Sequence, residues 1–422
     1  MELLAPAGGI DQLRAAIRFG ADAVYLATER FGMRARACNF PLETLPAAVA
    51  EAHAAGVPVH VTCNVLMHQG DLRELPAFFE AVQDAGVDAL IVSDLGAFSL
   101  AKKHAPKVEL HVSTQASVAN AESARMWHDL GAARVVCARE MSLEEIAEMR
   151  ANTPRDLAIE VFAHGAMCMA VSGRCLISAA LTGRSANKGH CTQPCRWNYT
   201  LEEEKRPGVH FPVEEAQGQS FIMNAKDLNM LTHLDALRAA GVDSIKIEGR
   251  NKKAFYVASV VGAYRRVLDG EDPADVEHEL YDISHRPYNT GFFFGEAEQA
   301  TDYDGYEQEC IHVGDVIGCE PCEPREPDNP SGAGRFRITA LCRNRWEEGQ
   351  ELEVLVPHAP VANITVRNLC WVPEDPDGTL KPPVMVPVAN RTVARYTFEV
   401  ERDIPAGSYL RQRVFRRTAR HE

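Results

Sequence analysis

The sequence predicts a closed (β/α)8 barrel with a cysteine-rich insertion after its seventh strand, followed by a smaller all-β domain at the C-terminus. Short apolar runs alternate with amphipathic stretches of helical length from residue 2 to about residue 270. This alternation is typical of parallel strands joined by helices, and eight such runs fit one closed, TIM-like barrel. Beyond that point, short β-type runs are separated by Pro, Gly, Asn and Asp, which favours a compact β domain.

The eight predicted barrel strands are residues 2–6, 23–27, 59–64, 89–93, 109–113, 134–138, 158–163 and 244–249. Several of the helical stretches between them end at glycine, as a helix C-cap often does. An open, doubly wound sheet is the alternative. It is disfavoured because "APAGGIDQL" after the first strand lacks the GxGxxG spacing, and because no GxxxxGK[ST] sequence occurs.

The predicted domains are a catalytic barrel over 1–270, a connector over 271–305 and a β-barrel or sandwich over 306–422. The cysteine-rich segment, 165–220, belongs to the barrel and is far longer than an ordinary strand-to-helix loop. Such barrels carry their chemistry at the C-terminal ends of the strands. The insertion therefore lies where an active site is expected.

Composition limits the possible functions. The chain is 46% hydrophobic and 24% charged, which is typical of a globular protein. The N-terminus is a poor secretory signal, and no apolar run reaches the roughly 18 residues of a membrane span, so we expect a cytoplasmic protein. A net charge of −15 disfavours general polyanion binding, although it leaves room for a local basic site.

The insertion contains four cysteines within twenty-eight residues: Cys168, Cys175, Cys191 and Cys195. Structural disulfides are rare in cytoplasmic proteins, whereas four thiolates can hold one zinc ion or one iron–sulfur cluster. The six-residue gap between the first two cysteines is long for a zinc knuckle and favours the cluster. Two other cysteines, Cys63 and Cys137, lie in apolar runs and are predicted to be small buried side chains.

The same insertion is basic. Residues 165–200 contain no Asp or Glu but four cations: Arg174, Arg184, Lys188 and Arg196. Trp197 and Tyr199 beside Arg196 could stack on an RNA base or pack in the core. The arginine-rich C-terminus, "RQRVFRRTARHE", is either a solvated end or an RNA-binding arm.

Residues 160–178, "EVFAHGAMCMAVSGRCLIS", resemble the defining motif of the collagenase-like "peptidase" family. The resemblance extends through "GHCTQPCRW", "MNAKDLNML", "SIKIEGRNK" and "YNTGFFFG", and so covers most of residues 1–300. It is strongest to the subgroup that hydroxylates the wobble uridine of tRNA to 5-hydroxyuridine in a prephenate-dependent reaction. Other members hydroxylate a 23S rRNA cytidine or support quinone hydroxylation, and these activities are the nearest alternatives.

The resemblance implies a [4Fe-4S] cluster, with structural zinc as the alternative, and prephenate as co-substrate. Three family ligand positions match Cys168, Cys175 and Cys191. The fourth is assigned to Cys195, because the chain has no cysteine between residues 196 and 309. The implied partner is the tRNA anticodon loop.

Proteolysis is disfavoured by the residues themselves. His278-Glu279 is followed by Leu-Tyr-Asp, so no HExxH zinc helix exists, and no GxSxG nucleophile elbow occurs. A single cysteine nucleophile would leave the other three cysteines unexplained. A non-catalytic, metal-bound scaffold is the alternative from another functional class.

Polar residues near the strand ends are the predicted catalytic set: Glu160, His164, Lys246, Glu248 and Arg250. Lys246, Glu248 and Arg250 alternate along the eighth strand and therefore share one face. His164 lies four residues before Cys168 and could act as an acid or base near neutral pH, although a purely structural histidine is slightly favoured.

A second predicted set would bind the co-substrate: Arg34, Arg36, Asn224 and Lys226. Arg34 and Arg36 follow the second strand and could hold a dicarboxylate through paired hydrogen bonds. A solvated loop is the alternative for these two arginines.

Overall fold

The structure, a computed structural model, describes residues 1–33, 39–167, 175, 177–194, 197, 201–202, 210–211, 226–295, 306–322 and 335–414. The chain forms two compact units. The first comprises Met1–Ile17, Ala21–Val257 and His285–Tyr306, and the second comprises Arg18–Gly20, Ala258–Ser284 and Glu307–Glu422. This division differs from the predicted boundaries, because residues 258–284 group with the β domain and residues 285–306 group with the barrel.

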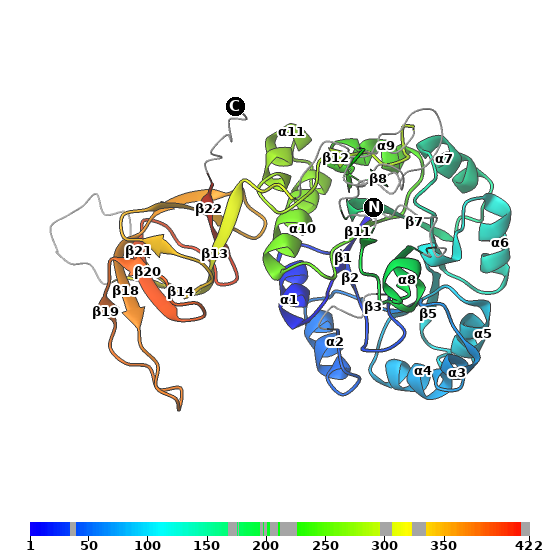
Figure 1. The fold of residues 1–422 in the computed structure, drawn as a ribbon, viewed down its shortest axis with the longest axis horizontal. Coiled ribbons are helices and arrows are strands. Elements are labelled where there is room, and N and C mark those ends of the chain that lie inside the picture. Colours follow the sequence, from blue (N-terminus) through cyan, green and yellow to red (C-terminus); the bar gives the residue numbers. More distant parts are fainter. Residues whose placement is uncertain are drawn as a thin grey trace. The chain divides into compact units, whose positions relative to one another are not determined.

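The first unit is a closed parallel barrel, as predicted (Figure 1). Strand β11 pairs with both β1 and β7 and so closes the ring. In chain order the strands are β1 (Glu2–Pro6), β2 (Ala23–Leu26), β3 (Val59–Cys63), β4 (Ala89–Val92), β5 (Glu109–Val112), β6 (Arg134–Val136), β7 (Ala158–Ala166) and β11 (Ser244–Ile247). All eight fall within or overlap the predicted ranges.

The strands are short and apolar because both of their faces are covered. Leu4, Tyr25 and Ile91 meet in the barrel interior. The helices around the ring in Figure 1 are α1 (Ile10–Arg18), α2 (Leu45–Ala54), α3 (Gln69–Leu72), α4 (Leu75–Asp84), α5 (Leu95–His104), α6 (Ala121–Asp129), α7 (Leu143–Ala151) and α9 (Leu234–Ala239). Side-chain caps begin several of them; the Ser142 hydroxyl, for example, accepts the backbone N–H of Glu145. Helix α10 (Ala254–Leu268) follows β11, and its residues from Ala258 onward belong to the second unit.

Two short strands extend the sheet beside the end of β7. Strand β10 (Asp227–Asn229) runs antiparallel to β7, and β12 (Tyr288–Asn289) runs parallel to β10. A further pair, β8 (Leu201–Glu202) and β9 (His210–Phe211), forms within the insertion. The sequence placed "YNTGFFFG" in a connector, but its first residues form β12, so this stretch belongs to the barrel unit.

The second unit contains a separate antiparallel sheet. Its strand order is β17-β16-β22-β13-β14-β21-β18-β19, and its core includes Trp346, Tyr396 and Phe398. The strands are β13 (Cys310–Pro321), β14 (Phe336–Cys342), β16 (Glu351–Leu355), β17 (Ala362–Thr365), β18 (Arg367–Val372), β19 (Val384–Met385), β21 (Arg395–Val400) and β22 (Tyr409–Arg413). A two-stranded sheet pairs β15 (Trp346–Glu347) with β20 (Val388–Ala389), and the short helix α11 spans Pro273–Val276.

Strand β22 corrects the interpretation of the C-terminus. The sequence predicts a solvated end or an RNA-binding arm for this segment, yet Arg411 is only 1% exposed. Its Nη2 lies 2.6 Å from Asp282 Oδ2 and 2.8 Å from Glu353 Oε2. These two carboxylates compensate the buried charge, so Arg411 belongs to the fold of the second unit. Residues 415–422 lie outside the described residues.

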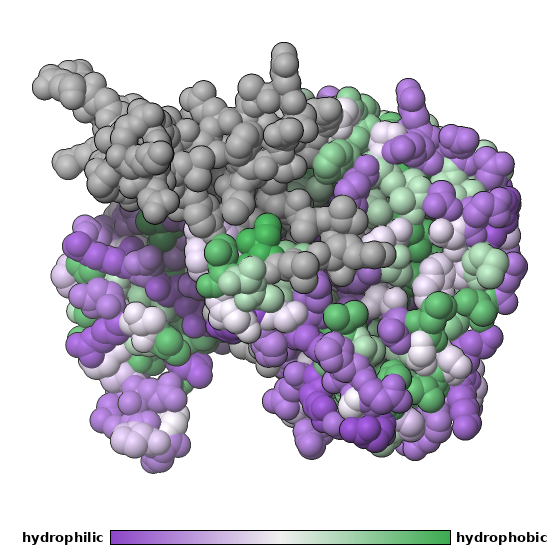
Figure 2. All heavy atoms as spheres, turned by 45° about the vertical axis from the view of Figure 1, so that its right-hand side comes forward, coloured by the Kyte–Doolittle hydropathy of each residue, from purple (hydrophilic) through white to green (hydrophobic). Residues whose placement is uncertain are grey.

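None of the helices in the described part of the chain has both the length and the hydropathy needed to cross a bilayer. On the face drawn in Figure 2, hydrophobic residues lie in small groups among hydrophilic ones.

Candidate active site at the barrel mouth

The end of β7 defines the barrel mouth, because this strand ends at Ala166, two residues before Cys168. A Cβ on Gly165, whose φ is +101°, would lie 2.5 Å from the Glu248 carbonyl oxygen, so only glycine fits there. The Glu248 N–H donates to the His164 carbonyl over 2.9 Å. The ends of β7 and β11 are therefore packed tightly together where the insertion begins. Cys168 itself lies outside the described residues.

The described part of the insertion folds around the short helix α8 (Ile177–Thr182). Ser178 is fully buried, and its hydroxyl donates to the Arg184 carbonyl over 2.6 Å. The same oxygen accepts the N–H of Thr192 over 3.1 Å. Ser178 thus joins the helix that follows Cys175 to the residue that follows Cys191.

Asn187 connects this segment to the barrel. Its carbonyl accepts the N–H of Leu66, after β3, over 2.7 Å. Its side-chain Nδ2 donates to the Cys175 carbonyl over 2.9 Å. The neighbouring Lys188 forms an ion pair with Asp71. These contacts hold the segment against loops of the barrel mouth, and in Figure 1 helix α8 is drawn at the centre of the strand ring.

Cys175 and Cys191 are partly exposed free thiols. The Cys191 Sγ accepts the backbone N–H of Gln193 over 3.3 Å, a bond that fixes the position of the sulfur. Both residues therefore fit the ligand role that the sequence assigned to them. Cys168 and Cys195 lie outside the described residues, so the complete four-cysteine site stays a prediction.

Cys63 and Cys137 have a different environment. Both are buried, and burial raises the pKa of each thiol, that of Cys137 to about 12. They are protonated core side chains, as predicted.

Glu160 and Lys246 lie inside the barrel and not at its mouth. The Lys246 ammonium donates to Glu160 Oε1, and Arg134 donates to Glu160 Oε2, each over 2.9 Å. Glu160 pairs in register with Ser244, which itself pairs with Glu2 at the start of β1. The network therefore begins at the amino ends of the strands, opposite the mouth, and such barrels carry their chemistry at the other end.

The charges of this network stabilise one another. Burial alone would raise the pKa of Glu160, but the charges of Lys246 and Arg134 outweigh it and lower the pKa to about 2. Burial also lowers the pKa of Lys246, while Glu160 opposes that shift. An anionic Glu160 between two cations is thus the stable arrangement.

Glu248 and Arg250 lie beyond the end of β11, at the mouth. Arg250 is 3% exposed, and its Nη1 donates to Thr62 Oγ1 over 3.2 Å. Glu248 Oε2 lies 3.8 Å from Nη2 of Arg139. The structure therefore brings these two predicted residues to the expected end of the barrel and separates them from Glu160 and Lys246.

Arg139 is a mouth residue that the sequence analysis missed. Its guanidinium stacks 3.7 Å from the Phe162 ring centroid and donates to the Ala166 carbonyl over 2.8 Å. It also lines a small, otherwise apolar pocket with Met167 and Phe293. Its position directly after the sixth predicted strand was the one sequence signal that could have indicated a mouth residue.

His164 lies in an aromatic and cationic group. It is 1% exposed, and its ring centroid lies 5.4 Å from that of Tyr288 and 6.2 Å from that of Tyr256. Burial, then the charges of His285 and Lys252, lower the pKa of His164 to about 3. His164 is therefore neutral at physiological pH, which excludes it as a cationic acid in the resting site. The only sequence signal for two of these neighbours, His285 and Tyr288, was the stretch "HRPYN".

The remaining predicted residues are placed as follows. Lys226 is partly exposed immediately before β10, and Trp197 is 46% exposed, which excludes core packing for that ring. The others lie outside the described residues: Arg34, Arg36, Arg196, Tyr199 and Asn224.

Similarity to known proteins covers most of the chain. The chain is 33% identical over 418 residues to the tRNA hydroxylation protein P of Escherichia coli, covering 87% of this chain and 88% of that protein. It is 38% identical over 396 residues to tRNA hydroxylation protein P1 of Bacillus subtilis, covering 89% and 87%. It is also 40% identical over 269 residues to the E. coli 23S rRNA 5-hydroxycytidine C2501 synthase, covering 64% of this chain and 39% of that protein.

The family match covers most of the barrel unit and its insertion, and also residues 258–284 of the second unit. The model of "Peptidase family U32" matches residues 8–303, which include the end of β7, the cysteines and both mouth residues of β11. This chain belongs to peptidase family U32.

Proposed function

We propose that this protein hydroxylates RNA in the cytoplasm, with the wobble uridine of tRNA as substrate and 5-hydroxyuridine as product. The observation that carries the proposal is similarity over almost nine-tenths of the chain to two proteins named for tRNA hydroxylation. The barrel mouth supports it, because the folded insertion there would meet a base turned out of the anticodon loop.

We also propose that the mouth holds a [4Fe-4S] cluster. Its ligands would be the four cysteines of the insertion: Cys168, Cys175, Cys191 and Cys195. The partial exposure of the free thiols Cys175 and Cys191 supports this role, and structural zinc is the alternative metal. When bound, such a cluster supplies redox chemistry or an open iron coordination position. Glu248 and Arg250, fixed at the end of β11, would orient the substrate beside it.

Prephenate is the proposed co-substrate. Replacing the C5 hydrogen of uridine with a hydroxyl removes two electrons from the base, so a second reactant must take part. The candidates to bind its carboxylates are Arg34, Arg36, Asn224 and Lys226, of which Lys226 lies partly exposed beside the end of β7.

A 23S rRNA cytidine is the second candidate substrate, because the named rRNA synthase is 40% identical to this chain. It ranks lower, since the chain spans only 39% of that protein, whereas it spans 88% of the E. coli tRNA hydroxylation protein.

The deciding experiment expresses this chain in an E. coli strain that lacks its tRNA hydroxylation protein. Mass spectrometry of nucleosides then measures 5-hydroxyuridine derivatives in tRNA and 5-hydroxycytidine in 23S rRNA. We expect restored tRNA hydroxylation, lost in Cys191→Ala but retained in Cys370→Ala, a matched control in the second unit. Iron and sulfide analysis of both purified variants tests the cluster separately. Unmodified tRNA with well-expressed protein would refute the proposed substrate.

A further inference from the structure

The loop that follows helix α8 carries an exposed cation, Arg184. Among the residues that the structure describes, none places a carboxylate within ion-pairing distance of its guanidinium. Lys188 is the other Arg or Lys of residues 177–194, and it pairs with Asp71. The whole stretch from residue 165 to residue 200 contains no Asp or Glu. The positive charge of Arg184 is therefore not neutralised by the segment that carries it.

Hydrogen bonds fix the backbone of this loop at Arg184 and at the residue that follows it. The Arg184 carbonyl accepts the hydroxyl of Ser178, which is fully buried, over 2.6 Å. The Ser185 carbonyl accepts the N–H of Lys188 over 3.2 Å and that of His190 over 3.0 Å. The exposed guanidinium thus extends from a rigid support, so a ligand that binds it has to order only one side chain.

The same loop lies beside both described cysteines of the insertion. Asn187 donates to the Cys175 carbonyl over 2.9 Å, and His190 immediately precedes Cys191. The Asn187 carbonyl accepts an N–H of the loop after β3, and Figure 1 draws α8 at the centre of the strand ring. An anion bound to Arg184 would therefore lie at the barrel mouth.

We infer that Arg184 binds a backbone phosphate of the RNA at the barrel mouth, an inference that rests on the proposed function. A guanidinium matches a phosphate group with paired, charge-assisted hydrogen bonds. Sites for small molecules are concave and enclose most of the ligand, whereas Arg184 stands on an exposed loop. Such a position suits a long polyanion, whose phosphates remain largely in contact with solvent.

The charge of the whole chain gives this contact a second effect. The net charge of −15 repels a polyanion from most of the surface. A cation without a local counter-charge therefore favours the approach of RNA to the end of the barrel at which Arg184 lies. Arg184 would thus contribute both to affinity and to the choice of the face that the RNA meets.

The test measures how RNA binding by the full-length protein depends on salt. The probe is a fluorescein-labelled anticodon stem–loop with uridine at the wobble position, and fluorescence anisotropy gives the dissociation constant at a series of KCl concentrations. We expect Arg184→Gln to reduce the slope of log K against log salt by about one and to weaken binding about tenfold at low salt. Arg184→Lys keeps the charge and should keep the slope.

Arg155→Gln is the matched control. Arg155 is also exposed and, within the described part of the chain, has no carboxylate partner, but it lies just before β7 and so at the opposite end of the barrel. Its substitution should change neither the affinity nor the slope.

The outcomes separate the possible failures. A wild-type salt slope in Arg184→Gln would overturn the inference. Weaker binding with an unchanged slope would also overturn it, because such a result indicates a structural role. Circular dichroism checks the fold of each variant, and Arg184→Met replaces Arg184→Gln if the latter does not fold. A wild-type protein that does not bind the stem–loop at any salt concentration would instead overturn the proposed function.

Discussion

Glu160→Gln distinguishes a stabilising ion network from a catalytic one. Glu160 is fully buried, and its neighbours hold its pKa at about 2, against 4.5 for an unperturbed glutamate. A difference of roughly 2.5 pKa units corresponds to about 3 kcal/mol of stability at neutral pH. This agrees with the loss of about 3–5 kcal/mol in stability that is typical when one partner of a buried ion pair is removed. The melting temperature should fall by about 6–12 °C.

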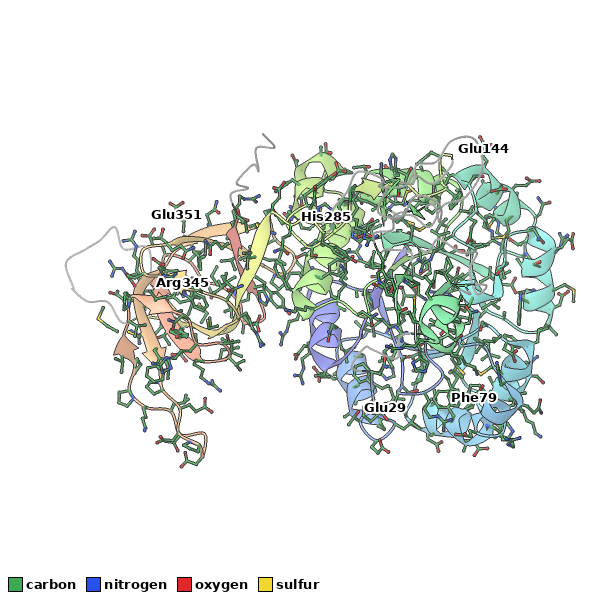
Figure 3. The ribbon with its side chains drawn as sticks, viewed as in Figure 1. Glu29, Phe79, Glu144, His285, Arg345 and Glu351 are labelled. Carbon is green, nitrogen blue, oxygen red and sulfur yellow. The ribbon has the colours of Figure 1, made fainter. Side chains whose placement is uncertain are left out.

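Thermal unfolding at pH 7 provides the assay. Lys246→Met alone should destabilise the barrel comparably, because it leaves Glu160 buried with one of its two cations removed. The double variant Glu160→Gln/Lys246→Met should recover part of the loss, since replacing both partners removes the uncompensated charge. Glu29→Gln is the matched control, because this glutamate is exposed (Figure 3). It should change stability by less than about 0.5 kcal/mol.

The contribution of Glu160 to stability depends on pH in a direction that its pKa shift determines. The folded-state pKa of Glu160 lies below its unfolded value. Its contribution is therefore complete above about pH 4.5 and disappears as the pH falls toward 2. The stability difference between wild type and Glu160→Gln should shrink over that range. A Glu160→Gln protein that has the wild-type melting temperature at pH 7 but no hydroxylation activity would refute this reasoning. Such a result would indicate a catalytic role for Glu160.

Three further predictions follow from the described contacts. Ser178→Ala should lower the iron content of the purified protein while leaving its circular dichroism unchanged, because it removes the hydroxyl that joins α8 to Thr192; full iron content would contradict this positioning role. Because burial lowers the pKa of His164 to about 3, its imidazole NMR signals should not titrate between about pH 5 and 8, and its contribution to stability should decline as the pH falls below about 6.5. Arg411→Met should destabilise the second unit by about 3 kcal/mol, since it leaves Asp282 buried with a lost partner; hydrogen exchange in β22 measures the change, and unaltered protection would count against it.

The barrel could be predicted from the sequence because its signal is local. Each strand is a continuous apolar run between amphipathic helices, and no distant residue is needed to recognise it. Strand β22 was missed for the opposite reason. Its residues "YLRQR" read as a charged tail, and only the distant carboxylates Asp282 and Glu353 make burial of Arg411 favourable.

The candidate site was predictable in part. Alternation along the strand predicts a common face for Lys246, Glu248 and Arg250, yet only Lys246 lies within β11 and the other two lie beyond its end. That difference separates an interior ion partner from two mouth residues. The contributions of Arg139 and Tyr288 depend on stacking with Phe162 and His285, and such contacts carry no periodicity along the chain.

The closed ring also determines when the barrel can be completed during translation. The Ser244 hydroxyl donates directly to Glu2 although the two residues are 242 positions apart, so β1 lacks its final neighbour until nearly three-fifths of the chain has been made. At translation rates of about 5–20 residues per second, this delay lasts about 12–50 s. All four cysteines of the insertion leave the ribosome before the ring can close. The nascent barrel therefore passes through a stage at which it is still open along one side.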